Sequence, residues 1–181
     1  VTHYLPTGNL ANMRHIIATH MQKTELTVEI ALYQPDIAGN VGTILRLAAC
    51  FGVPCHIIEP CGFPFSDKAL KRAGMDYAAQ AQMQRHADWE RFEQQAAANG
   101  QRIILMSSAA SIPLPQVIFE ANDIILMGSE GAGVPAAIHD RADLRIRIPM
   151  QPGFRSLNVA VAAAIALAEA LRQIGQFPTE T

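Results

Sequence analysis

Residues 122–133 read NDIILMGSEGAG, an apolar run followed by three glycines around one carboxylate. A near-continuous apolar run of this length is typical of a strand buried on both faces, and such strands occur mainly in parallel sheets. Residues 101–108, QRIILMSS, repeat the pattern and again end in small polar residues. Together the two runs predict an α/β domain, with a mainly parallel sheet covered by helices on both faces.

Predicted strands and helices alternate along the rest of the chain, which supports the same fold class. The first helix is expected to begin at Asn40 as its N-cap and to end at Gly52. The last helix is apolar on nearly every side, so we expect it to be buried all round. Further strands are expected at 28–33, 53–60 and 144–149, and helices at 40–52, 66–74, 88–100 and 156–173.

The composition fits one globular domain without an excess of positive charge. The chain has 181 residues, half of them hydrophobic, and a formal charge of −2 with a pI near 6.3. The domain is expected over 28–178, and residues 1–27, which show weak periodicity and no signal-peptide pattern, are expected to form a peripheral N-terminal extension. A nucleic-acid partner would therefore have to be held by a local basic patch.

Neither the cysteines nor the histidines are spaced like metal ligands. Cys50, Cys55 and Cys61 contain no C-x-x-C pair, and the six histidines form no H-x-x-x-H pattern. Three thiols acting as small apolar residues suit a reduced, cytoplasmic compartment. The longest apolar run, 159–168, has about half of the ~20 residues that a membrane span needs. We therefore expect a cytoplasmic protein without a metal ion or a membrane segment.

The glycines at 128–133 follow a predicted strand, where open parallel sheets bind their ligands. Glycine has no Cβ, so backbone N–H and C=O groups can approach a ligand closely. The pattern fits neither the dinucleotide fingerprint G-x-G-x-x-G, nor a phosphate-binding loop, nor a nucleophile elbow. Two interpretations remain open: a nucleotide-like ligand held by main-chain contacts, or a tight turn with Glu130 in solvent.

Two other stretches carry polar residues where helices are expected to start. Asn40 and Arg46 lie in NVGTILR, residues 40–46, where Arg46 could also be the solvated edge of an apolar helix. Arg155, Ser156 and Asn158 precede the last helix. There Ser156 could simply cap the helix, and Asn158 could be a hydrogen-bonded buried amide.

In chain order, NVGTILR, GSEGAGVP and RIPMQPGFRSLNVAVA resemble the three motifs of the SPOUT-class RNA 2′-O-ribose methyltransferases of the SpoU/TrmH type. ALYQPDIAGN, HIIEPCGF and DKALKRAGMDY extend the similarity over about residues 28–178. The pattern is most similar to the TrmL-like (YibK-like) enzymes, which methylate the ribose of the tRNA wobble nucleotide, a cytidine or modified uridine at position 34.

This resemblance implies a SPOUT fold with a C-terminal deep trefoil knot, a homodimer with active sites at the subunit interface, and S-adenosylmethionine as the cofactor. The residues that match the family's cofactor-binding positions are Met106, Ser107, Gly128, Glu130, Gly131, Ile148, Met150, Ser156 and Leu157. Those that match its polar catalytic positions are Arg46, Asn40, Glu130, Ser156 and Asn158.

The implied reaction moves the sulfonium methyl group to a ribose 2′-hydroxyl, whose proton must leave or be shared. Family proposals give the role of base to the arginine that matches Arg46, but guanidinium pKa values exceed ~12. Arg46 could instead orient a phosphate and stabilise the developing alkoxide. In either role, Arg46 is predicted to be essential.

The implied partner is the anticodon loop of tRNA, bound without a separate RNA-binding domain. Positive charge for it is predicted at Arg155, Lys71 and Arg72, with Lys68, Arg85, Arg145 and Arg147 as further candidates. Because the GSEG form also occurs in relatives that act elsewhere, 2′-O-methylation of another tRNA or rRNA position is one alternative. A catalytically inactive cofactor- or RNA-binding module is another. The missing G-x-G-x-x-G disfavours a nicotinamide dehydrogenase.

Overall fold

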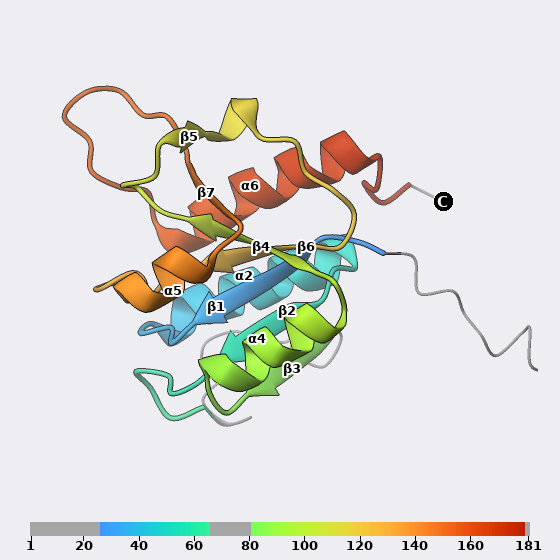
Figure 1. Ribbon diagram of the computed structural model, residues 1–181, viewed down its shortest axis with the longest axis vertical. Helices are drawn as coiled ribbons and strands as arrows, with labels where there is room; N and C mark the ends of the chain where they lie inside the picture. The colour runs from blue at the N-terminus through green and yellow to red at the C-terminus, as the bar shows by residue number, and fades with distance from the viewer. Residues whose placement is uncertain (1–25, 66–80, 180–181) are drawn as a thin grey trace, which may run out of the picture.

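A computed structural model of the chain describes residues 26–65 and 81–179. Its centre is a seven-stranded sheet in the order β3-β2-β1-β6-β4-β7-β5, in which every neighbouring pair is parallel (Figure 1). The predicted α/β class with a parallel sheet is therefore confirmed. The strands are β1 (Glu29–Tyr33), β2 (Cys55–Ile58), β3 (Met83–His86), β4 (Arg102–Met106), β5 (Ile112–Pro113), β6 (Asp123–Met127) and β7 (Leu144–Arg147).

Helices cover both faces of this sheet (Figure 1). Successive residues of β1 point to opposite sides, as a strand between two helical layers requires. Ile30 and Leu32 belong to the core under α2 and α6, whereas Ala31 and Tyr33 belong to the core under α4 and α5. The helices are α2 (Ala38–Phe51), α4 (Trp89–Ala98), α5 (Ala136–Arg141) and α6 (Val159–Ile174), with a 3-10 turn η1 (Leu114–Gln116).

The start of α2 differs from the prediction, whereas its end does not. The helix begins at Ala38 with Ile37 as its N-cap, so the prediction that Asn40 caps it was wrong. Gly52 ends the helix with φ 66, the left-handed conformation expected of a terminating glycine. The sequence pattern missed β3 and α5, which have only 4 and 6 residues. The helix predicted at 66–74 lies outside the described residues.

The last helix, α6, is buried on one side only. Ala163 and Leu167 are fully buried, but Val161 is 48% and Ile165 is 38% exposed. The expectation of burial on every side was therefore wrong for the single chain. Because Val161 and Ile165 lie four positions apart, they form one apolar stripe along the helix.

The thiols only partly match the expectation that they act as small apolar residues. Cys55 is buried, and burial raises the pKa of its thiol to about 12. Cys50, however, is exposed on α2. Within 26–65 and 81–179, no helix is long and apolar enough to cross a membrane. The same part of the chain gathers no group of three or more potential metal-binding His, Cys, Asp or Glu residues.

A row of three titratable side chains crosses β1, β2 and β3 under Phe92 of α4. The His56 Nε2 lies 2.6 Å from the Glu29 carboxylate, and the His56 Nδ1 lies 2.8 Å from the His86 Nε2. Burial and the neighbouring His56 lower the pKa of His86. Burial alone would raise the pKa of Glu29, but hydrogen bonds from His56 and Gln101 outweigh it and lower the pKa.

We expect the free energy of unfolding to fall as the pH drops below ~6.5, the ordinary histidine pKa. The pKa of His86 is lower in the folded protein than in the unfolded chain. Neutral His86 therefore contributes fully to the free energy of unfolding above pH ~6.5, and this contribution is lost as the pH falls through the pKa of the folded protein. Glu29 acts in the same direction, below the ordinary glutamate pKa of ~4.3. Urea titrations from pH 7.5 to 5 should show a flatter dependence of the free energy of unfolding on pH for His86→Gln than for the parent protein. An unchanged slope in His86→Gln would contradict this assignment.

Candidate active site

The candidate site lies at the carboxyl edge of the sheet, where β4, β6 and β7 end. In the strand register, Met106 at the end of β4 pairs with Met127 of β6 and with Ile146 of β7. The loops that follow these three strands therefore start side by side. They surround a cavity of about 780 Å³, a volume typical of small-molecule sites.

The loop after β6, residues 128–133, is closed on itself; we call it the glycine loop. Ser129 and Gly133 exchange two backbone hydrogen bonds of 3.0 and 2.9 Å. Gly133 has φ 68, which glycine adopts without strain. A Cβ built on Gly128 would lie 2.6 Å from the carbonyl carbon of Gly133. Because the backbone passes so close to itself, the position of Gly128 has no room for a side chain.

Glu130 joins the glycine loop to the start of α2 and, through Asn40, to α6. Its carboxylate accepts hydrogen bonds from the backbone N–H of Asp36 at 2.7 Å and from the Asn40 amide at 2.8 Å. The Asn40 Oδ1 in turn accepts a hydrogen bond from the Asn158 Nδ2 at 3.0 Å. The interpretation of Glu130 as a solvated turn residue was therefore wrong.

Asn158 has both a local and a tertiary role. Its Oδ1 accepts a hydrogen bond from the backbone N–H of Ala160 at 2.8 Å, so Asn158 is the N-cap of α6. Two alternatives from the sequence were therefore wrong: Ser156 does not cap this helix, and the amide of Asn158 is exposed and not buried. With Asn40 and Glu130, Asn158 forms a chain of hydrogen bonds that we call the amide relay.

Most of the predicted site residues line the same cavity. They contribute the apolar side chains of Met106 and Ile148 together with backbone N–H and C=O groups of the glycine loop. This mixture suits a ligand with an apolar ring and polar edges. What each residue does towards a ligand stays a prediction. The predicted residues in the cavity wall are Asn40, Met106, Ser107, Gly128, Glu130, Gly131, Ile148, Met150, Ser156, Leu157 and Asn158.

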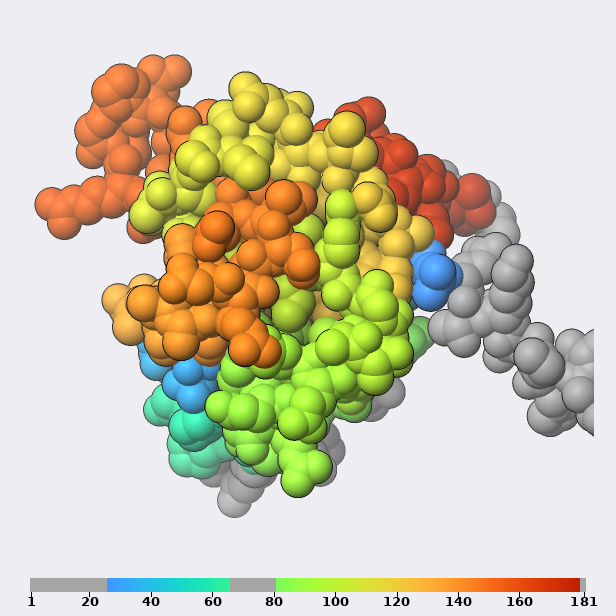
Figure 2. All heavy atoms as spheres, in the orientation of Figure 1, coloured from blue at the N-terminus to red at the C-terminus, as the bar shows by residue number. Residues whose placement is uncertain are grey.

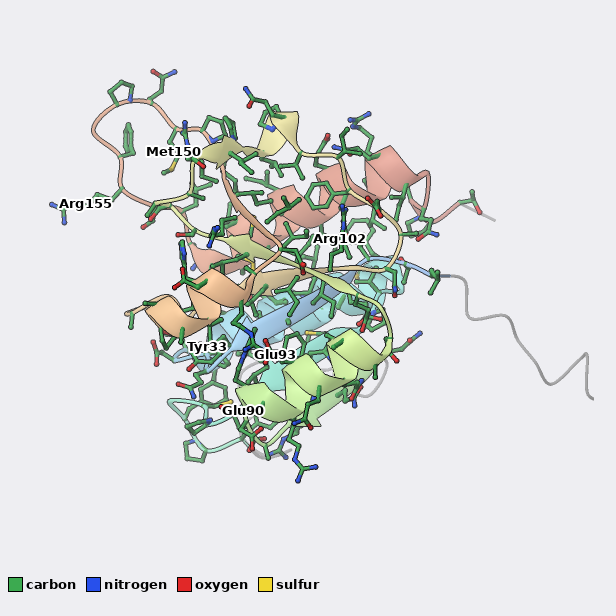
Figure 3. All side chains as sticks on the ribbon, viewed as in Figure 1. Tyr33, Glu90, Glu93, Arg102, Met150 and Arg155 are labelled. Atoms are coloured by element: carbon green, nitrogen blue, oxygen red, sulfur yellow. The ribbon has the colours of Figure 1, made fainter. Side chains whose placement is uncertain are left out.

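Two predicted arginines lie outside this wall. Arg46 is exposed on α2, and six positions after Asn40 it projects from a different side of the helix. The loop between β7 and α6 stands out from the body of the molecule (Figure 2), and its Arg155 points away while Met150 lies nearer the core (Figure 3). Lys71 and Arg72, like Lys68, lie outside the described residues.

The remaining basic candidates differ in their surroundings. Arg85 forms an ion pair with Glu59 and lies over the ring of Phe65, at 4.7 Å from its centre. Arg145 donates a hydrogen bond to the backbone carbonyl of His139 at 2.9 Å. Arg147 lines the cavity, so among these three it is the best placed to meet a substrate there.

Sequence reasoning overlooked Asp36 and His139. His139 lies in α5 and lines the cavity. Asp36 contacts two residues of the glycine loop. A carboxylate shortly after the end of β1 was the available signal for Asp36, because the carboxyl ends of parallel strands meet at one edge of the sheet.

A parallel sheet with a ligand-sized cavity among the loops at its carboxyl edge is typical of α/β proteins that bind small molecules. Residues 27–168 match the model of the SpoU rRNA Methylase family. The chain belongs to this family.

Two similar proteins carry the same name, tRNA (cytidine(34)-2'-O)-methyltransferase. The one from Beijerinckia indica is 54% identical over 146 residues, which cover 81% of this chain and 91% of the relative. The one from Escherichia coli K12 is 40% identical over 150 residues, which cover 82% of this chain and 94% of the relative. These similarities confirm the predicted resemblance to the TrmL-like enzymes.

Solved structures agree with the sequence comparison. A structure described as "Structural insights into the 2-OH methylation of C/U34 on tRNA" matches with a TM-score of 0.76 and 37% identity, covering 81% of this chain and 95% of the other. The AdoMet-bound rRNA methyltransferase from Sinorhizobium meliloti matches with a TM-score of 0.73 and 30% identity. That match covers 84% of this chain and 59% of the other.

Proposed function

We propose that this protein is an S-adenosylmethionine-dependent methyltransferase that acts on the ribose 2′-hydroxyl of nucleotide 34 in tRNA. The observation that carries the proposal is the amide relay. It joins Asn40, Glu130 and Asn158, one residue from each of the three family motifs, in the wall of one cavity. Relatives named for this activity are 54% and 40% identical over most of the chain.

The cavity suits an adenosyl cofactor in both size and chemistry. Its volume is about 780 Å³, and Met106 and Ile148 offer apolar contacts for a purine ring. The glycine loop offers backbone groups, which can approach a ligand closely because Gly128 has no Cβ. When bound, the cofactor supplies an electrophilic methyl group on a sulfonium. The residues that would hold it are Met106, Ser107, Gly128, Glu130, Gly131, Ile148, Met150, Ser156 and Leu157.

Some polar side chains of the cavity wall are held by hydrogen bonds within the protein, and others can bond to a substrate. Each oxygen of Glu130 accepts one hydrogen bond within the protein, so Glu130 sets the orientation of Asn40. The Ser156 hydroxyl, exposed in the wall, can donate and accept towards the ribose. We assign the stabilisation of the developing alkoxide to the guanidinium group of Arg46.

Arg46 requires a second subunit in this proposal. Next to the cavity, Ile37 is 50% and Leu157 is 40% exposed, and the stripe of Val161 and Ile165 continues this apolar surface along α6. We propose that the surface packs against a second copy of the chain in a homodimer, since exposed apolar patches mark interfaces. The Arg46 of one subunit would then act at the cavity of the other.

Further features of the family are also proposed for this chain. The C-terminal trefoil knot is supported by the loops after β4, β6 and β7, which surround one cavity. A cytoplasmic location follows from the proposed tRNA substrate. No metal ion is proposed, because the sulfonium itself activates the methyl group. Arg155 on the protruding loop is proposed to contact phosphate, as are Lys71 and Arg72.

The proposed activity predicts methyl transfer from labelled S-adenosylmethionine to unmodified total tRNA. Nuclease digestion and mass spectrometry should place a 2′-O-methyl group on the nucleotide at position 34. Methylation at another position would replace this target with another RNA site. Cofactor binding without any incorporation would instead favour a module that binds the cofactor but does not catalyse.

The variant Asn158→Asp should distinguish the two roles of Asn158, which caps α6 and belongs to the amide relay. Aspartate still accepts from the first N–H groups of the helix but cannot donate to the Asn40 Oδ1. We expect its free energy of unfolding to change little, whereas Asn158→Ala should lose about 1 kcal/mol. Both variants should transfer methyl groups at least about tenfold more slowly, as the loss of ~1.4 kcal/mol of transition-state stabilisation implies. Normal turnover in Asn158→Asp would show that the relay is only structural.

A further inference from the structure

We infer that Asp36 is a positioning residue for the cofactor-binding loop and that Gly62 holds Asp36 in place; this inference rests on the proposed function. Asp36 follows β1, the strand beside β6, so it stands next to the glycine loop at the carboxyl edge of the sheet. It is not one of the described residues that line the cavity. Any effect on a ligand must therefore pass through the residues that Asp36 contacts.

Asp36 and the glycine loop exchange two hydrogen bonds in opposite directions. The backbone N–H of Asp36 donates to the Glu130 Oε2 at 2.7 Å, and the Asp36 Oδ2 accepts from the backbone N–H of Gly131 at 3.2 Å. Glu130 and Gly131 both line the cavity. The side chain of Asp36 thus fixes the orientation of one peptide group in the loop, and its backbone fixes the neighbouring carboxylate.

The surrounding chain is built to hold Asp36 at this point. Gln34 has φ 43, a conformation that residues other than glycine rarely adopt. The N–H of Gly62 donates to the carbonyl of Pro35 at 2.9 Å. A Cβ on Gly62 would lie 3.0 Å from the Cα and 3.0 Å from the Oδ1 of Asp36. The loop after β2 therefore packs directly against Asp36, and glycine is the residue that fits there.

Binding of S-adenosylmethionine to the full-length protein, measured by titration calorimetry, tests this inference. Asp36→Ala should bind the cofactor about tenfold or more weakly, the usual cost of losing a hydrogen bond to a charged group. Its KM for the cofactor should rise by a similar factor, while kcat at saturating cofactor changes little. Asp36→Asn keeps an oxygen that can accept from Gly131 and should recover most of the affinity.

Two further variants control for nonspecific effects. Gly62→Ala should weaken cofactor binding in the same direction as Asp36→Ala, because the added methyl group displaces Asp36. Asp140→Ala removes an aspartate of α5 whose side chain is 79% exposed, and it should bind the cofactor normally.

Three outcomes would overturn the inference. The first is an unchanged Kd in Asp36→Ala, and the second is an equal loss in Asp36→Asn. The third is a fall in the melting temperature of unliganded Asp36→Ala that accounts for the weaker binding. A parent protein that binds the cofactor but methylates no tRNA would refute the proposed function alone. A parent that binds no cofactor would refute both.

Discussion

Arg46→Ala is expected to slow methyl transfer to tRNA by about 10²–10³-fold, the typical cost of removing one group that stabilises a developing oxyanion. The Kd for S-adenosylmethionine should stay within about twofold, because Arg46 does not line the cavity that is proposed to hold the cofactor. Single-turnover rates at saturating cofactor, together with calorimetry, would separate the two quantities.

Two further variants define what Arg46 contributes. Arg46→Lys keeps the positive charge but loses the planar fork of donors, so a partial rescue would indicate electrostatic stabilisation and no rescue would indicate bidentate phosphate contact. Arg91→Ala removes an exposed arginine of α4, on the opposite side of the sheet, and should leave turnover unchanged. Full activity in Arg46→Ala would remove Arg46 from the mechanism.

Gly128→Ala is expected to weaken cofactor binding by about 10–100-fold. The new methyl group would lie 2.6 and 2.7 Å from backbone atoms of Gly133, so the glycine loop must open to accommodate it. Such overpacking typically costs 1–3 kcal/mol, which corresponds to that change in Kd when the distortion falls on the binding loop. Calorimetry with S-adenosylmethionine measures the effect directly.

Other glycines provide matched controls for Gly128. A Cβ at Gly39 in α2 would meet nothing within 4 Å, so Gly39→Ala should bind the cofactor normally. A Cβ at Gly133 would also have no atom within 4 Å, but the φ of 68 disfavours alanine. We therefore expect Gly133→Ala to lose about 1 kcal/mol of binding free energy for the cofactor, a loss between those of the other two variants. Equal affinities for Gly128→Ala and Gly39→Ala would show that the closed loop does not bind the cofactor.

Local pattern was sufficient to predict the fold class but not the details that tertiary contacts decide. The apolar runs before Met106 and Met127 correctly indicated buried parallel strands. Asn40 is a preferred cap residue, yet it lies inside α2 because its amide bonds to Glu130 and Asn158. Cap preferences depend on one chain segment only, whereas the amide of Asn40 bonds to Glu130, 90 residues away.

The candidate site was predicted unevenly for the same reason. The residues of the glycine loop were compatible with either a ligand-binding loop or a tight turn. Only the resemblance to a known family favoured the ligand-binding loop. Asp36 was missed although it follows a predicted strand, because its own segment does not show that its partner is Gly131, 95 residues further along the chain. The exposure of Val161 and Ile165 was also not predicted, because the apolar pattern of α6 alone does not show which of its sides meets the sheet.

The amide relay also has a consequence for biosynthesis. Its first and last members, Asn40 and Asn158, are 118 residues apart, and a ribosome adding 5–20 residues per second needs on the order of ten seconds to make the second after the first. Throughout that interval the emerging polypeptide lacks one side of the cavity. The proposed cofactor site is therefore complete only in a chain whose C-terminal helix has already been synthesised.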